Sequence, residues 1–105
     1  PGRRAEAVRG LARAVRDGAL RLSGVADPDE VRDALTALPG IGPWTAEVIA
    51  LRALGDPDAF PAGDLGLRKA LGRGGLASEG AAADRAEAWR PWRSYASLWL
   101  WSEAA

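Results

Sequence analysis

The chain has 105 residues, enough for one small domain at most, and no apolar stretch near the ~20 residues of a membrane span, so we expect a cytoplasmic protein without membrane contact. Its composition, 48% hydrophobic and 27% charged, is globular, while the lack of cysteine and histidine excludes disulfides, cysteine-ligated metals and a histidine base. Because 14 basic residues balance 14 acidic ones, nucleic-acid binding would need local clusters of positive charge, and any catalysis would have to use carboxylates.

Two amphipathic helices are predicted in the first part of the chain. Between residues 3 and 20, apolar residues recur at helical spacing. Asp27, Pro28 and Glu30 then combine an N-cap, a first-turn proline and a capping-box acid, which predicts a helix over residues 28–37. The residues of the two helices that are expected to face inward are Val8, Leu11, Ala12, Val15, Val31, Ala34 and Leu35.

A helical hairpin is predicted over residues 28–54. Residues 38–42 (LPGIG) form a short turn, and Pro43 can take the first position of a helix that reaches about residue 54. Gly40 and Gly42 have no Cβ, so the backbone can approach a ligand, and the unpaired N–H groups of the following helix favour an anion. A DNA phosphate is the natural candidate, although two such glycines on their own more often only close a turn.

The second part of the chain is predicted to hold further helices and no strand, which makes the fold class all-α. An ordered loop leads to Asp64, which caps a short helix ending near residue 71. Helices are also expected over residues 79–89 and 92–102, interrupted at Pro91 because the residue before a proline avoids the helical region. The aromatic residues interpreted as packing are Trp89, Trp92 and Tyr95.

Three segments carry short motifs: residues 38–46 (LPGIGPWTA), 60–69 (FPAGDLGLRK) and 89–96 (WRPWRSYA). Together they resemble the helix-hairpin-helix DNA glycosylases, in the AlkA-like branch of 3-methyladenine DNA glycosylase II. The resemblance extends from the first predicted helix to Trp101, and it implies a helix-hairpin-helix helical bundle. The parts of the domain that it implies are the hairpin at residues 28–54, the catalytic loop at 60–64 and the closing helices at 79–103.

The same resemblance implies that the N-terminal part of the glycosylase domain is absent from this sequence. In the family that part forms the other wall of the base pocket, so we expect exposed apolar surface on the hairpin half, which favours self-association. The expected partners are double-stranded DNA with alkylated bases, and the missing N-terminal half or a self-associated copy of the chain that completes the fold. The expected location is the cytoplasm, in association with the bacterial nucleoid.

Asp64 matches the catalytic aspartate of the family. Cleavage of an N-glycosidic bond builds positive charge on the sugar, so a fixed carboxylate can stabilise the transition state and orient or deprotonate water. Local sequence alone favours an N-cap role for Asp64, and one residue can fill both roles. Asp56 and Asp58 are interpreted as turn residues without a chemical role. The resemblance therefore implies a DNA glycosylase that acts on alkylated bases of the 3-methyladenine type.

A base pocket is also implied by the resemblance, with Trp101, Trp44 and Val48 as its lining. Trp101 stands where AlkA-like enzymes stack an indole on the extruded base, and a cationic methylated purine favours an electron-rich face. Trp44 occupies a position where bifunctional members carry a nucleophilic lysine, which implies simple hydrolysis that leaves an abasic site. Packing beneath the hairpin is the alternative role for Trp44. Val48 and Ser102 replace aromatic residues of better-known members, which leaves the substrate range open.

Two further sites are implied on the hairpin. The residues expected to bind DNA phosphate are Gly40, Ile41, Gly42 and Thr45. The backbone carbonyls expected to hold a structural Na⁺ or K⁺ are those of Thr36, Leu38 and Ile41. No other cofactor is expected.

Two other functions remain open from the sequence. The chain could be a non-catalytic helix-hairpin-helix DNA-binding module or an inactive fragment, or it could be a small helical interaction domain without a nucleic-acid role. Asp64 argues against a pure binding module, because such a module does not need an acid at the end of the loop. The interaction domain would require the hairpin glycines to be turn residues only.

Overall fold

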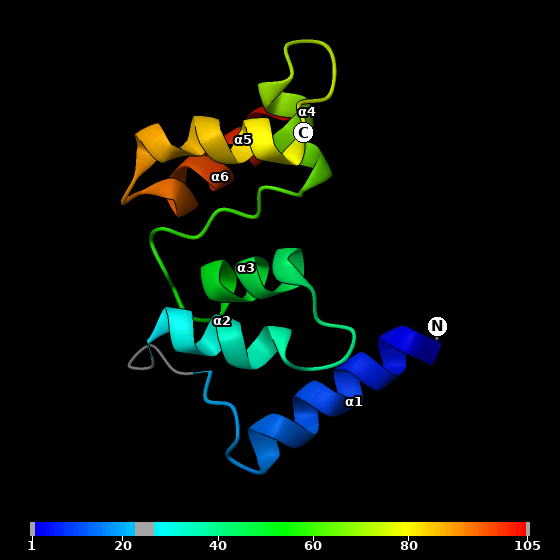
Figure 1. The fold of residues 1–105 in the computed structure, drawn as a ribbon. Helices are drawn as coiled ribbons and strands as arrows, with labels where there is room; N and C mark the ends of the chain where they lie inside the picture. The colour runs from blue at the N-terminus through cyan, green and yellow to red at the C-terminus, as the bar shows by residue number, and fades with distance from the viewer. Residues whose placement is uncertain (1, 23–26, 105) are drawn as a thin grey trace. The chain divides into compact units, whose positions relative to one another are not determined.

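The computed structural model describes residues 2–22 and 27–104, and these residues form six α-helices, one 3₁₀ helix and no strand (Figure 1). In chain order the elements are α1 (Gly2–Arg16), α2 (Pro28–Thr36), α3 (Pro43–Arg52), α4 (Leu65–Leu71), α5 (Glu79–Ala86), the 3₁₀ helix η1 (Glu87–Trp89) and α6 (Arg93–Ala104). The all-α prediction is confirmed. Within the same residues, no helix has the length and hydropathy that a membrane span requires.

The chain divides into two compact units, Pro1–Gly55 and Asp56–Ala105. The first, the hairpin unit, contains α1 to α3, and the second, the C-terminal unit, contains α4 to α6. Each unit has a hydrophobic core of its own.

In the hairpin unit, α2 and α3 lie side by side as the predicted hairpin (Figure 1). Asp27 is the N-cap of α2, because its carboxylate accepts the backbone N–H of Asp29 at 3.0 Å. An ion pair between Arg32 and Glu47, whose side chains are mostly buried, joins the two helices. Local capping, this ion pair and the apolar core that the two helices share therefore define the hairpin.

The buried face of α1 differs from the prediction. Three of the four residues expected to face inward are exposed: Val8, Ala12 and Val15. Leu11 does pack against the core, together with Ala7 and Ala14, and the small alanines let α1 approach the hairpin closely. The expectation for α2 is confirmed, because its residues in the core are Val31, Ala34 and Leu35.

The turn of the hairpin packs on α1 through Gly40. The φ angle of Gly40 is +84°, a left-handed conformation that favours glycine, and a Cβ built there would lie 2.8 Å from the Cβ of Ala7. Gly42 differs, since its φ angle is −93° and a Cβ built there would meet nothing within 4 Å. The fold therefore requires glycine at position 40 and not at position 42.

In the C-terminal unit, α4 packs against α6 and α5. The buried residues of this core are Phe60, Leu67, Ala82 and Ala86. The ring of Trp89 lies against Phe60 with 6.2 Å between the ring centroids, which confirms the predicted packing role of Trp89. The single helix predicted over residues 79–89 is divided into α5 and η1.

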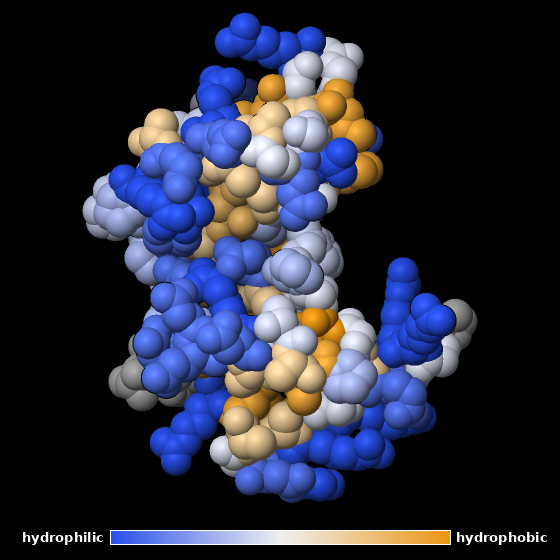
Figure 2. Space-filling model, in the orientation of Figure 1, coloured by the Kyte–Doolittle hydropathy of each residue, from blue (hydrophilic) through white to orange (hydrophobic). Residues whose placement is uncertain are grey.

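The predicted packing role of Trp92 and Tyr95 is wrong. Their side chains are 58% and 60% exposed and lie against each other, with ring centroids 5.9 Å apart. The buried face of α6 carries Ser94 and Ser97 instead, which can be buried because both hydroxyls form hydrogen bonds within the unit. As a result, large aromatic side chains occupy the exposed face of α6, and Figure 2 shows apolar residues at the surface of both units.

Candidate active site

The loop before α4 is anchored to the start of α6 by Ser94. The backbone N–H of Ala59 donates to the Ser94 hydroxyl at 2.8 Å, and this hydroxyl donates to the carbonyl of Asp56. The backbone N–H of Ser94 donates to the carbonyl of Pro57 at 2.9 Å. Ser94 and Ala59 are buried, so breaking these bonds would leave polar groups unsatisfied away from water. The loop therefore follows a defined path to α4.

A second anchor of the same loop is the carboxylate of Asp58, which the sequence indicated only as a turn residue. The Nε of Arg93 donates to one carboxylate oxygen at 2.8 Å, and Nη1 of Arg90 donates to the other at 3.1 Å. The side-chain hydrogen bond from Arg93 holds the pKa of Asp58 below its ordinary value of 3.8, and the charge of Arg90 acts in the same direction. Asp58 thus links the loop to both sides of Pro91.

This anchor predicts that the C-terminal unit loses stability in acid. Because the folded-state pKa of Asp58 lies below 3.8, its contribution is present above that pH and is lost as the pH falls through the folded-state pKa. Asp58→Asn should lower the free energy of unfolding at neutral pH by about 1–3 kcal/mol. It should also make the free energy of unfolding fall less steeply below pH ~4. Urea titrations followed by circular dichroism at several pH values measure both effects.

The matched control for this prediction is Asp84→Asn. Asp84 is exposed in the same unit and forms no ion pair within residues 2–22 and 27–104. In this variant the free energy of unfolding should depend on pH as it does in the unmodified chain. If Asp58→Asn also leaves that pH dependence unchanged, Asp58 does not anchor the loop.

The loop ends at Asp64, the N-cap of α4. The N–H of Asp64 donates to the carbonyl of the fully buried Pro61 at 2.8 Å. One carboxylate oxygen, Oδ2, accepts the N–H of Leu67 at 3.0 Å and the indole N–H of Trp101 at 2.7 Å. The structure thus brings together two residues singled out from the sequence, Asp64 and Trp101, and shows the N-cap role. The two donors hold the carboxylate in one orientation.

Gly66 makes room for this hydrogen bond. A Cβ built on Gly66 would lie 3.1 Å from Oδ2 of Asp64 and 3.2 Å from Cδ1 of Trp101, which is tighter than ordinary van der Waals contact. A side chain at this position would therefore push the indole away from the carboxylate. Sequence reasoning missed Gly66, because its neighbour Trp101 is 35 positions away in the chain and only the folded unit brings them together.

In the hairpin unit, Gly42 is the N-cap of α3 and places no side chain over its first N–H groups. A cavity of about 450 Å³ beside the turn is lined by Gly40, Ile41 and Thr45 together with Arg3 and Arg4 of α1. Both arginines belong to the arginine-rich first segment of the sequence, but no site role was predicted for them. Three of the four residues predicted to bind phosphate thus line a cavity together with two arginines.

Comparison with known proteins shows what the chain is similar to. The chain is 50% identical over 103 residues to a Mycobacterium tuberculosis protein named as the bifunctional transcriptional activator and DNA repair enzyme AlkA. It is 37% identical over 101 residues to DNA-3-methyladenine glycosylase 2 of Escherichia coli, and 37% identical over 106 residues to a Bacillus subtilis protein named as a DNA-3-methyladenine glycosylase. The chain is a homologue of the AlkA-like DNA glycosylases.

The similarity covers 97%, 96% and 94% of this chain, respectively, but only 21%, 35% and 37% of the three relatives, whose C-terminal part it matches. The chain therefore spans little more than a third of the relatives at most. No family model matches it.

The remaining residues predicted for the base pocket lie on α3. Trp44, in the first turn, is 47% exposed, which argues against the alternative that it only packs beneath the hairpin. Val48, one turn later, is half-buried. Trp44 and Val48 belong to the hairpin unit, and Asp64 and Trp101 belong to the C-terminal unit. A pocket that combines these four residues remains a prediction.

The predicted cation site uses carbonyl oxygens of the hairpin. The carbonyl of Leu38 already accepts the N–H of Ile41 at 3.2 Å, so only its second lone pair is left for a cation. Residues 2–22 and 27–104 contain no cluster of three acidic, histidine or cysteine side chains that could hold a metal. A Na⁺ or K⁺ bound by the backbone carbonyls of Thr36, Leu38 and Ile41 remains a prediction.

Proposed function

We propose that this chain carries the catalytic carboxylate and the phosphate-binding hairpin of a monofunctional DNA glycosylase that hydrolyses the N-glycosidic bond of alkylated bases such as 3-methyladenine. The observation that carries the proposal is the 2.7 Å hydrogen bond from the Trp101 indole to the Asp64 carboxylate. It places a large aromatic ring beside an oriented negative charge, the two groups that a flipped base and its sugar require. The names of the relatives support the reaction class.

The chemistry requires little more than this carboxylate. Water attacks C1′ of the deoxyribose as the C1′–N bond breaks, and the electron pair of that bond leaves with the base. A base made cationic by alkylation leaves as a neutral molecule, so no strong general acid is needed. Positive charge develops on the sugar, which the Asp64 carboxylate stabilises, and the proton of the attacking water passes to Asp64 or to solvent.

Hydrolysis without strand cleavage fits the hairpin. A bifunctional mechanism needs an amine that attacks C1′ and forms a Schiff base. The only lysine of the chain is Lys69, on α4. The hairpin position at which bifunctional members of the family carry a nucleophilic lysine holds Trp44 instead. The expected product is therefore an intact strand with an abasic site.

The hairpin supports binding to duplex DNA through the phosphate backbone. The first N–H groups of α3 follow Gly42, where no side chain covers them, and such groups favour an anion. Arg3 and Arg4 add positive charge beside the turn. Contacts of this kind position a protein on DNA without reading its sequence.

Gly42→Asp should weaken the binding of duplex DNA of any sequence by about tenfold or more, because it places a carboxylate against the phosphate. The substitution should not destabilise α3, since aspartate is favoured at an N-cap and a Cβ at position 42 would meet no other atom within 4 Å. Fluorescence anisotropy at several salt concentrations measures the change, and Gly42→Asn is the neutral control of the same shape. Equal affinities for the two variants would exclude a phosphate at this position.

The experiment that tests the function is single-turnover release of 3-methyladenine from methylated duplex DNA by this chain, followed by alkali. Release with strand breaks only after alkali supports a monofunctional glycosylase. Strand breaks before alkali contradict the monofunctional mechanism. Salt-sensitive DNA binding without release favours the alternative, a non-catalytic binding module, and absence of both contradicts a role on DNA.

A further inference from the structure

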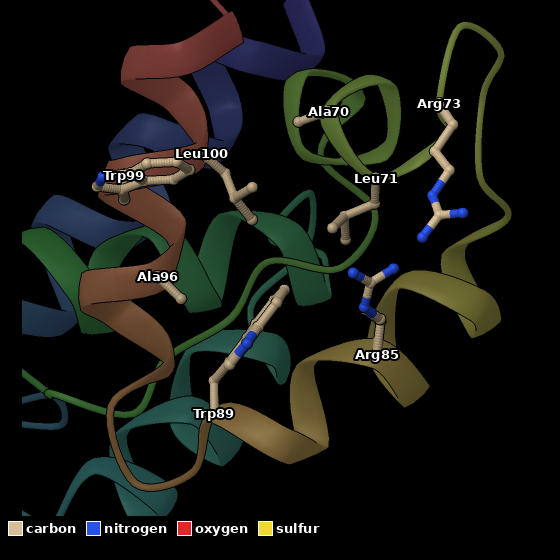
Figure 3. A pocket seen from close by; sticks show the side chains of 8 residues that line it. All are labelled: Ala70, Leu71, Arg73, Arg85, Trp89, Ala96, Trp99 and Leu100. Atoms are coloured by element: carbon tan, nitrogen blue, oxygen red, sulfur yellow. The ribbon is translucent and has the colours of Figure 1, made fainter.

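The C-terminal unit contains a cavity that the proposed reaction does not use. Its volume is about 430 Å³, within the range of small-molecule sites, and neither Asp64 nor Trp101 lines it. It is formed by residues of α4, α5, η1 and α6 and of the loop that follows α4 (Figure 3). Its apolar lining consists of Ala70, Leu71, Trp89, Ala96, Trp99 and Leu100.

Two arginines meet at this cavity. Arg85 projects from α5 and Arg73 from the loop after α4, and their guanidinium groups point toward each other (Figure 3). Both residues are exposed, and neither has an ion pair or a side-chain hydrogen bond within the part of the chain that the structure describes. Like charges that face each other repel, so an anion between them would be stabilised by both.

Aromatic surface lies across the same cavity from this positive charge (Figure 3). Trp99 is 64% exposed, although an indole of this size is usually covered, and Trp89 contributes a second ring to the lining. Exposed indoles bind nucleobases by stacking, and guanidinium groups bind phosphate through paired N–H donors. An apolar ligand alone would not use the arginines, and an inorganic anion alone would not use the rings.

We propose that this cavity binds a nucleotide, with its phosphate between Arg73 and Arg85 and its base against Trp99. A free nucleoside monophosphate and one nucleotide of a single DNA strand present the same chemistry. The site is independent of the proposed glycosylase reaction, because Asp64 is not part of it.

Calorimetry with the full chain tests this proposal with three ligands: deoxyadenosine 5′-monophosphate, deoxyadenosine and inorganic phosphate. The nucleotide should bind at least about tenfold more tightly than either of its parts, since it makes both the charged and the stacking contacts. Arg73→Gln and Arg85→Gln should each weaken nucleotide binding by about tenfold, and so should Trp99→Leu. Circular dichroism should show unchanged folding of these surface variants.

Matched controls separate this site from other charges and from the proposed active site. Lys69→Gln removes one exposed positive charge from the same unit, and Asp64→Asn alters the proposed catalytic residue, so both should bind the nucleotide as the unmodified chain does. A short single-stranded oligonucleotide distinguishes the two sources. If it binds through Arg73 and Arg85 while the free nucleotide does not, the ligand is a DNA strand.

Three results would overturn the proposal. The first is that neither the nucleotide nor the oligonucleotide binds. The second is that both arginine variants bind them unchanged. The third is that inorganic phosphate, or an acidic peptide, binds as well as the nucleotide, because the cavity would then select for charge alone.

Discussion

Asp64→Asn is expected to slow single-turnover base release by on the order of 10²–10⁴-fold while duplex DNA binds as before. Asparagine keeps an oxygen that can accept the N–H of Leu67 and the indole N–H of Trp101, so the cap and the position of the ring should persist. What the variant lacks is the negative charge that stabilises the developing positive charge of the sugar. Base release and fluorescence anisotropy, measured on the same preparations, separate the two effects.

A binding experiment tests the same role of Asp64 without turnover. A duplex with a cationic pyrrolidine in place of the target sugar resembles the charged transition state, whereas a tetrahydrofuran at that place is neutral. The unmodified chain should prefer the cationic analogue, and Asp64→Asn should reduce that preference by at least about tenfold. An unchanged preference, or an unchanged rate of release, would remove the catalytic assignment and leave Asp64 as a helix cap.

Gly40→Ala is expected to destabilise the hairpin unit by roughly 2–4 kcal/mol. The φ angle of +84° is unfavourable for alanine, and the added methyl group would lie 2.8 Å from the Cβ of Ala7. To relieve this clash, α1 would have to move away from the turn. That movement would separate the core residues of α1 from those of the hairpin. Urea denaturation measures the loss, and amide hydrogen exchange of the buried Leu35 assigns it to the hairpin unit.

Gly42→Ala is the matched control for this prediction. It adds the same methyl group two positions later, at a φ angle of −93° and with nothing within 4 Å, so its effect should stay within about 0.5 kcal/mol. Equal losses for the two variants would mean that the hairpin does not pack on α1 through Gly40.

Most of the helices could be predicted from the sequence, because their boundaries depend on neighbouring residues. Asp27 with Pro28, Pro43 and Asp64 each act within the first turn of a helix, and these signals located the starts of α2, α3 and α4. The pairing of α2 with α3 followed from the shortness of the turn between them. The resemblance to the AlkA-like family, confirmed by comparison, singled out Asp64 and Trp101.

The buried faces of α1 and α6 could not be predicted in the same way. Hydropathy assigned Val8 to the core, yet the hairpin turn approaches closely enough only for Ala7. Near the start of α6, hydropathy favoured burial of Trp92 over Ser94. Ser94 is buried instead, because its hydroxyl forms a hydrogen bond with the backbone N–H of Ala59 in the loop before α4. A helical pattern identifies which faces of a helix could be buried. Which of them is buried depends on the shape and the hydrogen-bonding groups of the element that packs against the helix.

The sequence by itself determined the fold class and the hairpin, because caps and turns are local and act over a few residues, and the resemblance of its motifs pointed to Asp64 as the candidate catalytic acid. Only the tertiary structure decided how that acid is held. Asp64 contacts Trp101 across 37 positions of the chain, and the loop before it is anchored by Ser94 and Asp58 through partners 32 to 38 positions away. Contacts of that range depend on how helices pack, and packing responds to shape and to buried polar groups that no local pattern records.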